Sequence, residues 1–353
     1  MNTIILQKPG ELILAETAAP AAPGPGEALV RVHRVGVCGT DYHAFAGKQP
    51  YFSYPRILGH ELGVEVLELG PIDATGNPQH VKPGDKCSVE PYVNCGQCIA
   101  CRRGKPNCCM QMRVIGVHTD GGMREKFLVP VRKLHPANAL SYEQIALVET
   151  LSIGAHAVDR AGVQADDTVL VIGAGPIGLS VIQFAAAKAR TLVMDVSSTR
   201  LAFCREKLGI RDTIEVSTGA TGSPPVGNDQ AAAAVLGLTR NENATVVIDA
   251  TGNPKSMYAA LGYLAHGGRL VYVGLFPGEF SLSDPEFHKR ETTLMGSRNS
   301  LPEDFTRIIR MIEAKQIDTS PWITHRAPVA RLVETFPTWT APGSGVLKAI
   351  IEF

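Results

Sequence analysis

Between residues 168 and 297 the sequence alternates short apolar runs with alanine-rich runs of helical character. The apolar runs are rich in valine, leucine and isoleucine, as buried parallel strands are. Neighbouring parallel strands need a long crossover connection, usually a helix. This region therefore predicts a doubly wound, parallel α/β sheet. Its expected strands are TVLVIGAG, TLVMD, TVVIDATG, RLVYVG and TTLMGS.

The first of these strands ends in GAGPIG, which fits the dinucleotide-binding pattern G-x-G-x-x-G. In this pattern Gly173 permits the tight turn, Gly175 lets the backbone approach the pyrophosphate, and Gly178 allows close helix–sheet packing. The helix expected to open at Pro176 and Ile177 then presents its free N–H groups to the phosphates. A strand, this turn and a helix in succession favour a nucleotide site over a glycine-rich turn without a ligand.

Asp195 ends the next expected strand, twenty residues after Gly175. A carboxylate at this place accepts hydrogen bonds from the ribose hydroxyls and repels a 2′-phosphate, so the sequence favours NAD as the cofactor. Arg200, five residues later, either covers the adenine ribose or is a solvated helix residue. It keeps NADP open as the lesser alternative.

The first 150 residues have a different residue pattern, with short Val- and Leu-rich runs broken by glycine and proline. They predict a β-rich region. A chain of 353 residues is longer than one ordinary domain, so two domains are expected.

The charge pattern limits the classes of partner. Lysine and arginine together number 34, as do aspartate and glutamate, and no block of like charge stands out. This balance disfavours nucleic acid and anionic membranes as partners. No apolar run reaches the length of a transmembrane helix, and the first residues lack the apolar run of a signal peptide. We therefore expect a cytoplasmic protein, in which cysteines are more often metal ligands than disulfides.

The segment NCGQCIACRRGKPNCC holds five of the eight cysteines. Four of them follow the spacing C-x2-C-x2-C-x7-C, which is typical of a tetrahedral Cys₄ zinc site. Such a closed site organises a loop and does no chemistry. An iron–sulfur cluster is the first rival, but its common bacterial run needs a shorter last gap followed by proline. Disulfides are the second rival. The expected ligands of this structural zinc are Cys95, Cys98, Cys101 and Cys109.

A second, dispersed set of donors lies earlier in the chain. GVCGTDYH contains Cys38, and GHE contains His60 and Glu61. Each of these is weak by itself, because a lone cysteine or a His-Glu pair more often packs or lies at a surface.

These segments carry a family resemblance. On GVCGTDYH, LGHE, the four-cysteine loop, VETLSIGAHAV, GAGPIG, VIDATG and SRNS, the chain resembles the zinc-dependent medium-chain alcohol dehydrogenases along essentially its whole length. Within that superfamily it is most similar to the polyol and sugar-acid branch, which holds the sorbitol, L-threonine and L-gulonate/L-galactonate dehydrogenases.

The resemblance implies a GroES-like β-rich catalytic domain, formed by residues 1–150 and completed by about 291–353. It implies a Rossmann NAD-binding domain over 151–290. The implied activity is NAD-dependent oxidation of a secondary alcohol in a polyol, sugar acid or related hydroxy compound, with one catalytic and one structural Zn²⁺ per chain. The implied assembly is a homodimer or homotetramer.

The resemblance also implies residue roles. A catalytic zinc is held by Cys38, His60 and an acid, which is either Glu61 or Glu149 of VET, and the sequence leaves open which of the two binds directly. The zinc polarises the substrate hydroxyl as a Lewis acid. Thr40 and His43 match the proton relay of the family.

Further matches concern the substrate and the nicotinamide. Arg298 matches an arginine on the substrate or nicotinamide side, where a guanidinium suits a polyhydroxylated or carboxylated substrate; the alternative is a surface arginine. Ala44 and Asn299 stand where sorbitol dehydrogenase has other substrate-contacting residues, which disfavours sorbitol. The backbone expected to line the nicotinamide is Val273, Gly274 and Leu275.

Two alternatives to an active zinc enzyme share this fold. One is a catalytically silent or regulatory dinucleotide-binding relative, which the complete set of zinc and relay residues disfavours. The other is a zinc-free quinone reductase, which would lack both cysteine motifs.

Overall fold

A computed structural model describes the whole chain except residues 50–51, 74–79, 217–226 and 342. The chain divides into two compact units, one formed by 1–152 with 301–353 and the other by 153–300. The second division falls at residue 300 rather than near 291. The reason is that strand β15 (Thr293–Gly296) pairs with β14 (Leu264–Tyr272) and so belongs to the second unit.

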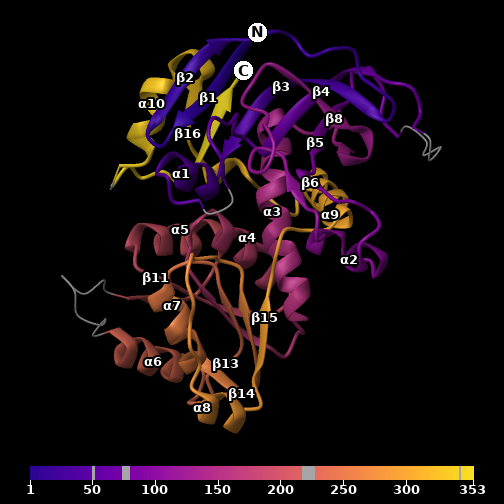
Figure 1. Cartoon of the computed structure of the whole chain (residues 1–353). Coiled ribbons are helices and arrows are strands. Elements are labelled where there is room, and N and C mark those ends of the chain that lie inside the picture. The colour runs from indigo at the N-terminus through magenta and orange to yellow at the C-terminus, as the bar shows by residue number, and fades with distance from the viewer. Residues whose placement is uncertain (50–51, 74–79, 217–226, 342) are drawn as a thin grey trace. The chain divides into compact units, whose positions relative to one another are not determined.

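The second unit is built on a six-stranded sheet in the order β12-β11-β10-β13-β14-β15 (Figure 1). All its pairings are parallel. This is the Rossmann strand order, so the predicted doubly wound sheet is confirmed. The remaining strands are β10 (Thr168–Ile172), β11 (Arg190–Asp195), β12 (Asp212–Glu215) and β13 (Ala244–Asp249). The helices are α4 (Pro176–Ala185), α5 (Ser198–Leu208), α6 (Gly227–Leu238), α7 (Pro254–Ala259), η3 (Ala260–Tyr263) and α8 (Asp284–Lys289).

The strand order reverses between β10 and β13, which pair side by side although 71 residues separate their ends. Ligands of doubly wound sheets bind outside the carboxyl ends of the strands at such a reversal. The glycine-rich turn that follows β10 lies at this point. The fold therefore places the predicted nucleotide motif where this class of sheet binds its ligand.

The first unit contains a seven-stranded sheet in the order β16-β17-β3-β4-β5-β9, with β8 also paired to β3. Its apolar face closes one large core that runs from Ile4 to Ile351. The strands are β1 (Asn2–Lys8), β2 (Glu11–Glu16), β3 (Glu27–Val37), β4 (Glu61–Leu69), β5 (Lys86–Val89), β8 (Lys126–Pro130), β9 (Leu134–Pro136), β16 (Ile323–Pro328) and β17 (Lys348–Glu352).

The helices of this unit include α3, whose last residues belong to the second unit. They are α1 (Gly39–Phe45), α3 (Tyr142–Ala161), α9 (Pro302–Glu313) and α10 (Leu332–Trp339), with short turns η2 (Val131–Lys133), η4 (Ser320–Trp322) and η5 (Val329–Arg331). A small lobe is made by β6 (Tyr92–Val93), α2 (Ile99–Arg102), η1 (Pro106–Cys108) and β7 (Arg113–Val114).

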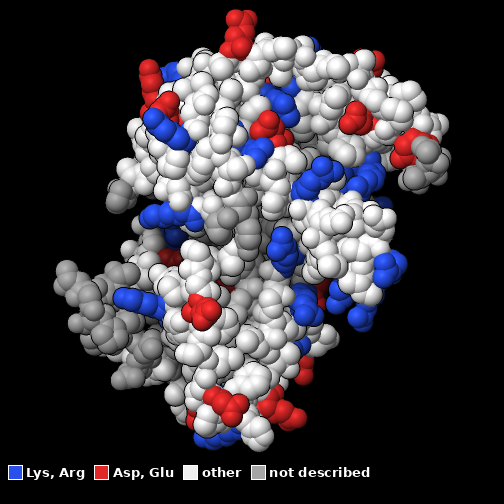
Figure 2. All heavy atoms as spheres, viewed as in Figure 1, with Lys and Arg blue, Asp and Glu red and all other residues white. Residues whose placement is uncertain are grey.

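Two surface properties complete the description. No helix among the described residues is long and apolar enough to cross a membrane. Lysine and arginine side chains are interspersed with aspartate and glutamate over the face shown in Figure 2.

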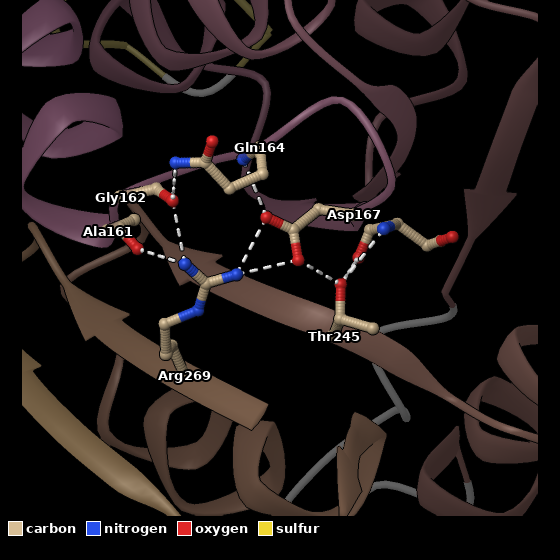
Figure 3. A network of polar contacts seen from close by, with 7 residues as sticks. Ala161, Gly162, Gln164, Asp167, Thr245 and Arg269 are labelled. Atoms are coloured by element: carbon tan, nitrogen blue, oxygen red, sulfur yellow. Dashed lines mark hydrogen bonds and ion pairs between the residues drawn. The ribbon is translucent and has the colours of Figure 1, made fainter. Parts of the chain in front are cut away.

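A polar network fixes the end of α3 to the sheet of the second unit (Figure 3). The Arg269 guanidinium on β14 donates to the carbonyls of Ala161 and Gly162 at 2.8 and 2.7 Å, and to both oxygens of Asp167 at 2.6 Å. Asp167 also accepts from the Thr245 hydroxyl at 2.7 Å. One arginine thus satisfies carbonyls that the helix end leaves without intrahelical partners.

The pKa of Asp167 is shifted by this network. Burial works to raise it, but hydrogen bonds from the Gln164 N–H, Thr245 and Arg269 outweigh burial and lower the pKa. The stabilising contribution of Asp167 is therefore present above the ordinary pKa of aspartate and is lost as the pH falls through the lowered value.

We predict that Asp167→Asn lowers the free energy of unfolding of the second unit by about 1–3 kcal/mol at neutral pH, because it removes charge-assisted hydrogen bonds. The loss should shrink as the pH is lowered. Urea unfolding followed by circular dichroism at several pH values measures it. Asp212→Asn is the control, because the Arg190 partner of Asp212 is 46% exposed. A loss for Asp167→Asn no larger than for this control would contradict the prediction.

Candidate metal centre and dinucleotide site

Strands β3 and β4 bring the dispersed donors together. They pair antiparallel with Gly36 opposite Glu61, so Cys38, just after β3, lies beside the start of β4. The potential ligand atoms of Cys38, His60 and Glu61 all lie within 4.8 Å of one another. Three residues that are 22 and 23 positions apart in sequence thus form one cluster.

Gly36 makes room for the Glu61 carboxylate. A Cβ on Gly36 would come within 2.0 Å of Glu61 Oε2, a distance that no side chain tolerates. Glu61 itself is fully buried. The glycine before Cys38 in GVCG is therefore required by the acid on the neighbouring strand.

Lys348, the first residue of β17, balances the charge of Glu61. Its Nζ lies 2.7 Å from each Glu61 oxygen, and the ammonium is 1% exposed. Burial works to lower the pKa of Lys348, but the charge of Glu61 outweighs burial and raises it. The structure thus contains a buried ion pair beside the donor cluster.

His60 has a carboxylate partner on the other side of the ring. Its Nδ1 lies 3.8 Å from Asp41 Oδ1, and both atoms are buried without a hydrogen-bond partner. The other Asp41 oxygen accepts from the Cys38 N–H at 2.9 Å. A metal-bound histidine commonly faces a carboxylate in this way, which fixes its tautomer and orientation.

Burial works to lower the pKa of His60, yet the charges of Asp41 and Cys38 outweigh it and raise that pKa well above its ordinary value. Burial raises the pKa of Asp41, against the charge of His60. The acidic groups around His60 therefore favour a positive charge at its ring. A metal ion bound to the ring would supply such a charge in place of a proton.

The second acid, Glu149, comes from α3. It is buried, and its Oε1 accepts a hydrogen bond from the Tyr92 hydroxyl. Burial raises the pKa of Glu149, His60 lowers it and Glu61 raises it. Glu149 therefore interacts electrostatically with the cluster, although among the described residues its oxygens fall outside the group of three that lies within 4.8 Å.

The donor set fits a divalent cation. Four acidic groups (Cys38, Asp41, Glu61 and Glu149) share the pocket with one lysine and one histidine, and all but Cys38 are buried. Buried charge without compensation is strongly unfavourable. A mixture of thiolate, imidazole and carboxylate suits zinc among the common metals.

The expected relay residues lie on α1, which begins directly after Cys38. Thr40 is half-buried and His43 is exposed. Residues three apart on a helix share a face, so both side chains lie along one side of α1.

The four clustered cysteines converge in the small lobe. Sγ–Sγ distances are 3.5 Å for Cys98–Cys101 and for Cys95–Cys109, and 3.9 Å for Cys98–Cys109. Tetrahedral zinc with Zn–S bonds of about 2.3 Å separates its sulfurs by about 3.8 Å. These spacings fit a Cys₄ zinc, and all four thiols are free of disulfides.

Backbone N–H groups of the lobe point at these sulfurs. Hydrogen bonds from the Cys101 and Met110 N–H groups lower the pKa of Cys98 to about 6, so its thiolate predominates at neutral pH. Burial raises the pKa of Cys109 to about 11. Cys108 is exposed and lies outside the cluster.

The glycine-rich turn is closely packed on its inner side and open on its outer side. A Cβ on Gly178 would lie 1.7 Å from the Gly173 carbonyl oxygen, so only glycine lets α4 start this close to the turn. Gly173 has φ +95°, which favours glycine. A Cβ on Gly175 would meet only Arg200 Nη1, at 3.8 Å. The Arg200 side chain therefore lies next to the expected pyrophosphate position.

Asp195 is more constrained than the sequence suggests. One carboxylate oxygen accepts from the Ala174 N–H at 2.5 Å and the other from the Ser197 N–H at 2.7 Å. Each oxygen has a further lone pair with which to accept from a ribose hydroxyl. Asp195 thus ties the glycine-rich turn to β11 as well as standing at the end of that strand.

Asp249, at the carboxyl end of β13, organises the other side of the site. Its carbonyl accepts from the N–H groups of Val273 and Gly274 at 2.9 and 3.2 Å, and its buried carboxylate accepts from Thr251 and Ser256. The segment expected to line the nicotinamide is therefore anchored to the neighbouring strand end. Leu275, which completes it, is 59% exposed.

Arg298 follows β15 and is exposed in the second unit, whereas the Cys38 cluster belongs to the first. Arg298 and the Cys38 cluster are therefore each described within their own unit.

Comparisons with known proteins identify the family. Residues 24–139 match the alcohol dehydrogenase GroES-like domain, and residues 176–314 match the zinc-binding dehydrogenase family. L-galactonate-5-dehydrogenase of Escherichia coli K12 is 42% identical over 100% of this chain and 99% of its own. The chain belongs to the zinc-dependent medium-chain alcohol dehydrogenases, in their polyol and sugar-acid branch.

Two further similarities agree with this assignment. Sorbitol dehydrogenase of Ovis aries is 32% identical over 99% of this chain and 96% of its own. The structure of an alcohol dehydrogenase (rspB) from Escherichia coli CFT073 in complex with NADH superimposes with a TM-score of 0.86, at 27% identity over 100% of this chain and 99% of that one. The predicted family, two-domain fold class and class of NAD-dependent zinc oxidoreductase are confirmed.

Three residues that the sequence did not single out are central to the sites: Lys348, Tyr92 and Asp249. Lys348 had a usable signal, since it is a positive charge inside the otherwise apolar run VLKAII. Asp249 likewise ends an apolar strand. Tyr92 had none, because its partner Glu149 is 57 residues away.

We predict that Cys98→Ser removes one zinc per chain and lowers the melting temperature by about 5 °C or more, because a closed Cys₄ site contributes folding energy. Metal analysis and differential scanning calorimetry measure the two effects. Cys108→Ser changes a neighbouring exposed cysteine and should keep both the zinc and the stability. Equal zinc content in the two variants would contradict a Cys₄ site.

Proposed function

We propose that this enzyme oxidises a secondary hydroxyl of a sugar acid or related polyol with NAD as the hydride acceptor. The observation that carries the proposal is the cluster of Cys38, His60 and Glu61, which is separate from the Cys₄ lobe. The 42% identity to an L-galactonate-5-dehydrogenase supports a sugar acid as the substrate class.

In this mechanism Cys38 and His60 would hold the catalytic zinc, with Glu61 and Glu149 as the acids beside it. When bound, zinc supplies a Lewis acid that makes the substrate hydroxyl easier to deprotonate. Asp41, whose Oδ1 lies 3.8 Å from Nδ1, would act on the His60 ring through its charge. Tyr92 holds the Glu149 carboxylate at Oε1.

Proton release uses α1. The half-buried Thr40, two residues after Cys38, would accept the substrate's hydroxyl proton while giving up its own, and the exposed His43 would release a proton to solvent. Because α1 begins directly after a metal donor, its first turn is fixed by the same residues that hold the metal.

The second unit binds the cofactor. The N-terminus of α4, with Gly175, Pro176 and Ile177, receives the pyrophosphate, and Asp195 accepts from the adenosine ribose. Arg200 lies over the same turn. The anchored segment of Val273, Gly274 and Leu275 lines the nicotinamide.

Arg298 recognises the substrate carboxylate in this proposal, because a guanidinium fork pairs with two carboxylate oxygens. We further propose a cytoplasmic homodimer or homotetramer, in keeping with the family.

We predict that Cys38→Ser abolishes turnover, with a loss of at least about a thousandfold in kcat/KM, because the metal polarises the substrate oxygen. The variant should retain one zinc per chain and bind NAD with unchanged affinity, since the cofactor residues lie in the other unit. Metal analysis, NAD titration and steady-state kinetics are the measurements. Preserved activity would remove Cys38 from the mechanism.

We also predict a substrate order. NADH formation should be fastest, as kcat/KM, with aldonates and slower with sorbitol and L-threonine. Arg298→Gln should lower kcat/KM for aldonates by about 10- to 100-fold, because it removes a charge-assisted hydrogen bond, and should change that for neutral polyols little. An equal loss on both substrate classes would contradict the role of Arg298.

A further inference from the structure

The two acids beside the candidate catalytic metal are held by different kinds of partner. Glu61 is paired through both oxygens with a full positive charge, the Lys348 ammonium, at 2.7 Å. Glu149 receives one neutral hydroxyl, from Tyr92, at one oxygen. Glu61 thus has two contacts and a full opposite charge where Glu149 has one contact and no opposite charge, so Glu61 is the more firmly held acid.

Lys348 is itself rigidly placed. Besides Glu61, its Nζ lies 3.1 Å from Thr150 Oγ1 and 3.2 Å from the Val37 carbonyl oxygen. An ammonium has three protons, so these oxygens use its full donor capacity. Strand β17 pairs with the end of β3, with Ala349 opposite Val37, so the backbone of Lys348 is fixed beside Cys38.

The surroundings leave Glu61 no second neutralising partner. Gly36 packs against its carboxylate, and Lys348 is the one lysine or arginine that bonds to it among the described residues. A metal ion bound by Cys38 and His60 would therefore share the Glu61 carboxylate with the ammonium, which already occupies one lone pair of each oxygen. The same ammonium also repels the cation through space.

We propose that Lys348 is a positioning residue that holds Glu61 against the pull of the metal and so limits how tightly this centre binds zinc. The inference rests on the proposed metal role of Cys38 and His60. A carboxylate restrained in this way leaves a coordination position that a substrate oxygen can take without displacing a strong ligand.

The test measures zinc affinity and stability separately. Lys348→Met should bind the zinc of this centre about 10-fold more tightly or better, the scale on which residues around metal ligands act. The protein without that zinc should melt at a lower temperature than the wild type, because Glu61 is left buried without a counter-charge. A purely structural role would weaken both properties together.

Zinc dissociation constants are measured by competition with a chromophoric chelator, and the relevant zinc is the one that Cys38→Ser lacks. Melting temperatures are measured before and after this zinc is restored. Lys348→Arg keeps the charge and should stay close to the wild type. Lys348→Gln, which can still donate to Glu61, should lie between the wild type and Lys348→Met, and it serves if the methionine variant fails to fold.

Two further variants isolate the cause. Adding Lys348→Met to Glu61→Gln should tighten zinc binding much less than Lys348→Met does in the wild type, because the acid that Lys348 restrains is gone. Lys133→Met removes the other buried Lys–Glu pair of the first unit, that of Lys133 with Glu90. Lys133→Met should lower the melting temperature and leave the zinc dissociation constant of the Cys38 centre unchanged.

The inference is overturned if neither Lys348→Met nor Lys348→Gln binds this zinc more tightly than the wild type does, provided that Cys38→Ser still lacks one zinc. If Cys38→Ser holds as much zinc as the wild type, the proposed metal centre itself fails.

Discussion

The cluster of buried acidic groups around His60 is the constraint on which the first unit depends. Asp41, Glu61 and Glu149 are all removed from water beside the Cys38 thiol. Burying such groups together is tolerable only if positive charge is built in or bound. The protein supplies part of it with Lys348, and the charges of Asp41 and Cys38, which raise the pKa of His60, favour a second positive charge there.

This requirement explains features of the chain that otherwise look unrelated. Gly36 has no side chain because the Glu61 carboxylate occupies that space. The C-terminal strand returns beside β3, where its first residue supplies the balancing ammonium. Helix α3 contributes an acid and a threonine at successive positions: Glu149 interacts electrostatically with His60, and Thr150 accepts a hydrogen bond from Lys348. The first unit is therefore closed by segments from both ends of the chain.

The second unit, which carries the dinucleotide motif, is organised by backbone contacts rather than by buried charge. Its turn is built from glycines that admit no side chain, and two strand-end aspartates, Asp195 and Asp249, bind backbone N–H groups of the adjoining loops. A carboxylate that accepts two backbone N–H groups fixes a loop without using a side chain that the cofactor would have to displace. Asp195 therefore fixes the shape of the glycine-rich turn, in addition to the ribose contact proposed for it.

Much of this was predictable from sequence because it is local. The strand series, GAGPIG and the four-cysteine spacing depend on neighbours a few residues apart, and each predicts its structure directly. Cys38, His60 and Glu61 needed the family resemblance, since nothing in their spacing requires them to meet. Which acid is free to bind the metal was left open by the sequence.

The sequence by itself determined the fold class, the nucleotide motif and the closed cysteine lobe. Each of these depends on periodicity or ligand spacing between residues that are close in sequence. Only the tertiary structure decided what holds each acid. Lys348 and Glu61 are 287 residues apart, and Tyr92 and Glu149 are 57 apart. Pairings at such separation arise from strand register and helix packing, and these are set by the burial of the whole core rather than by any one segment.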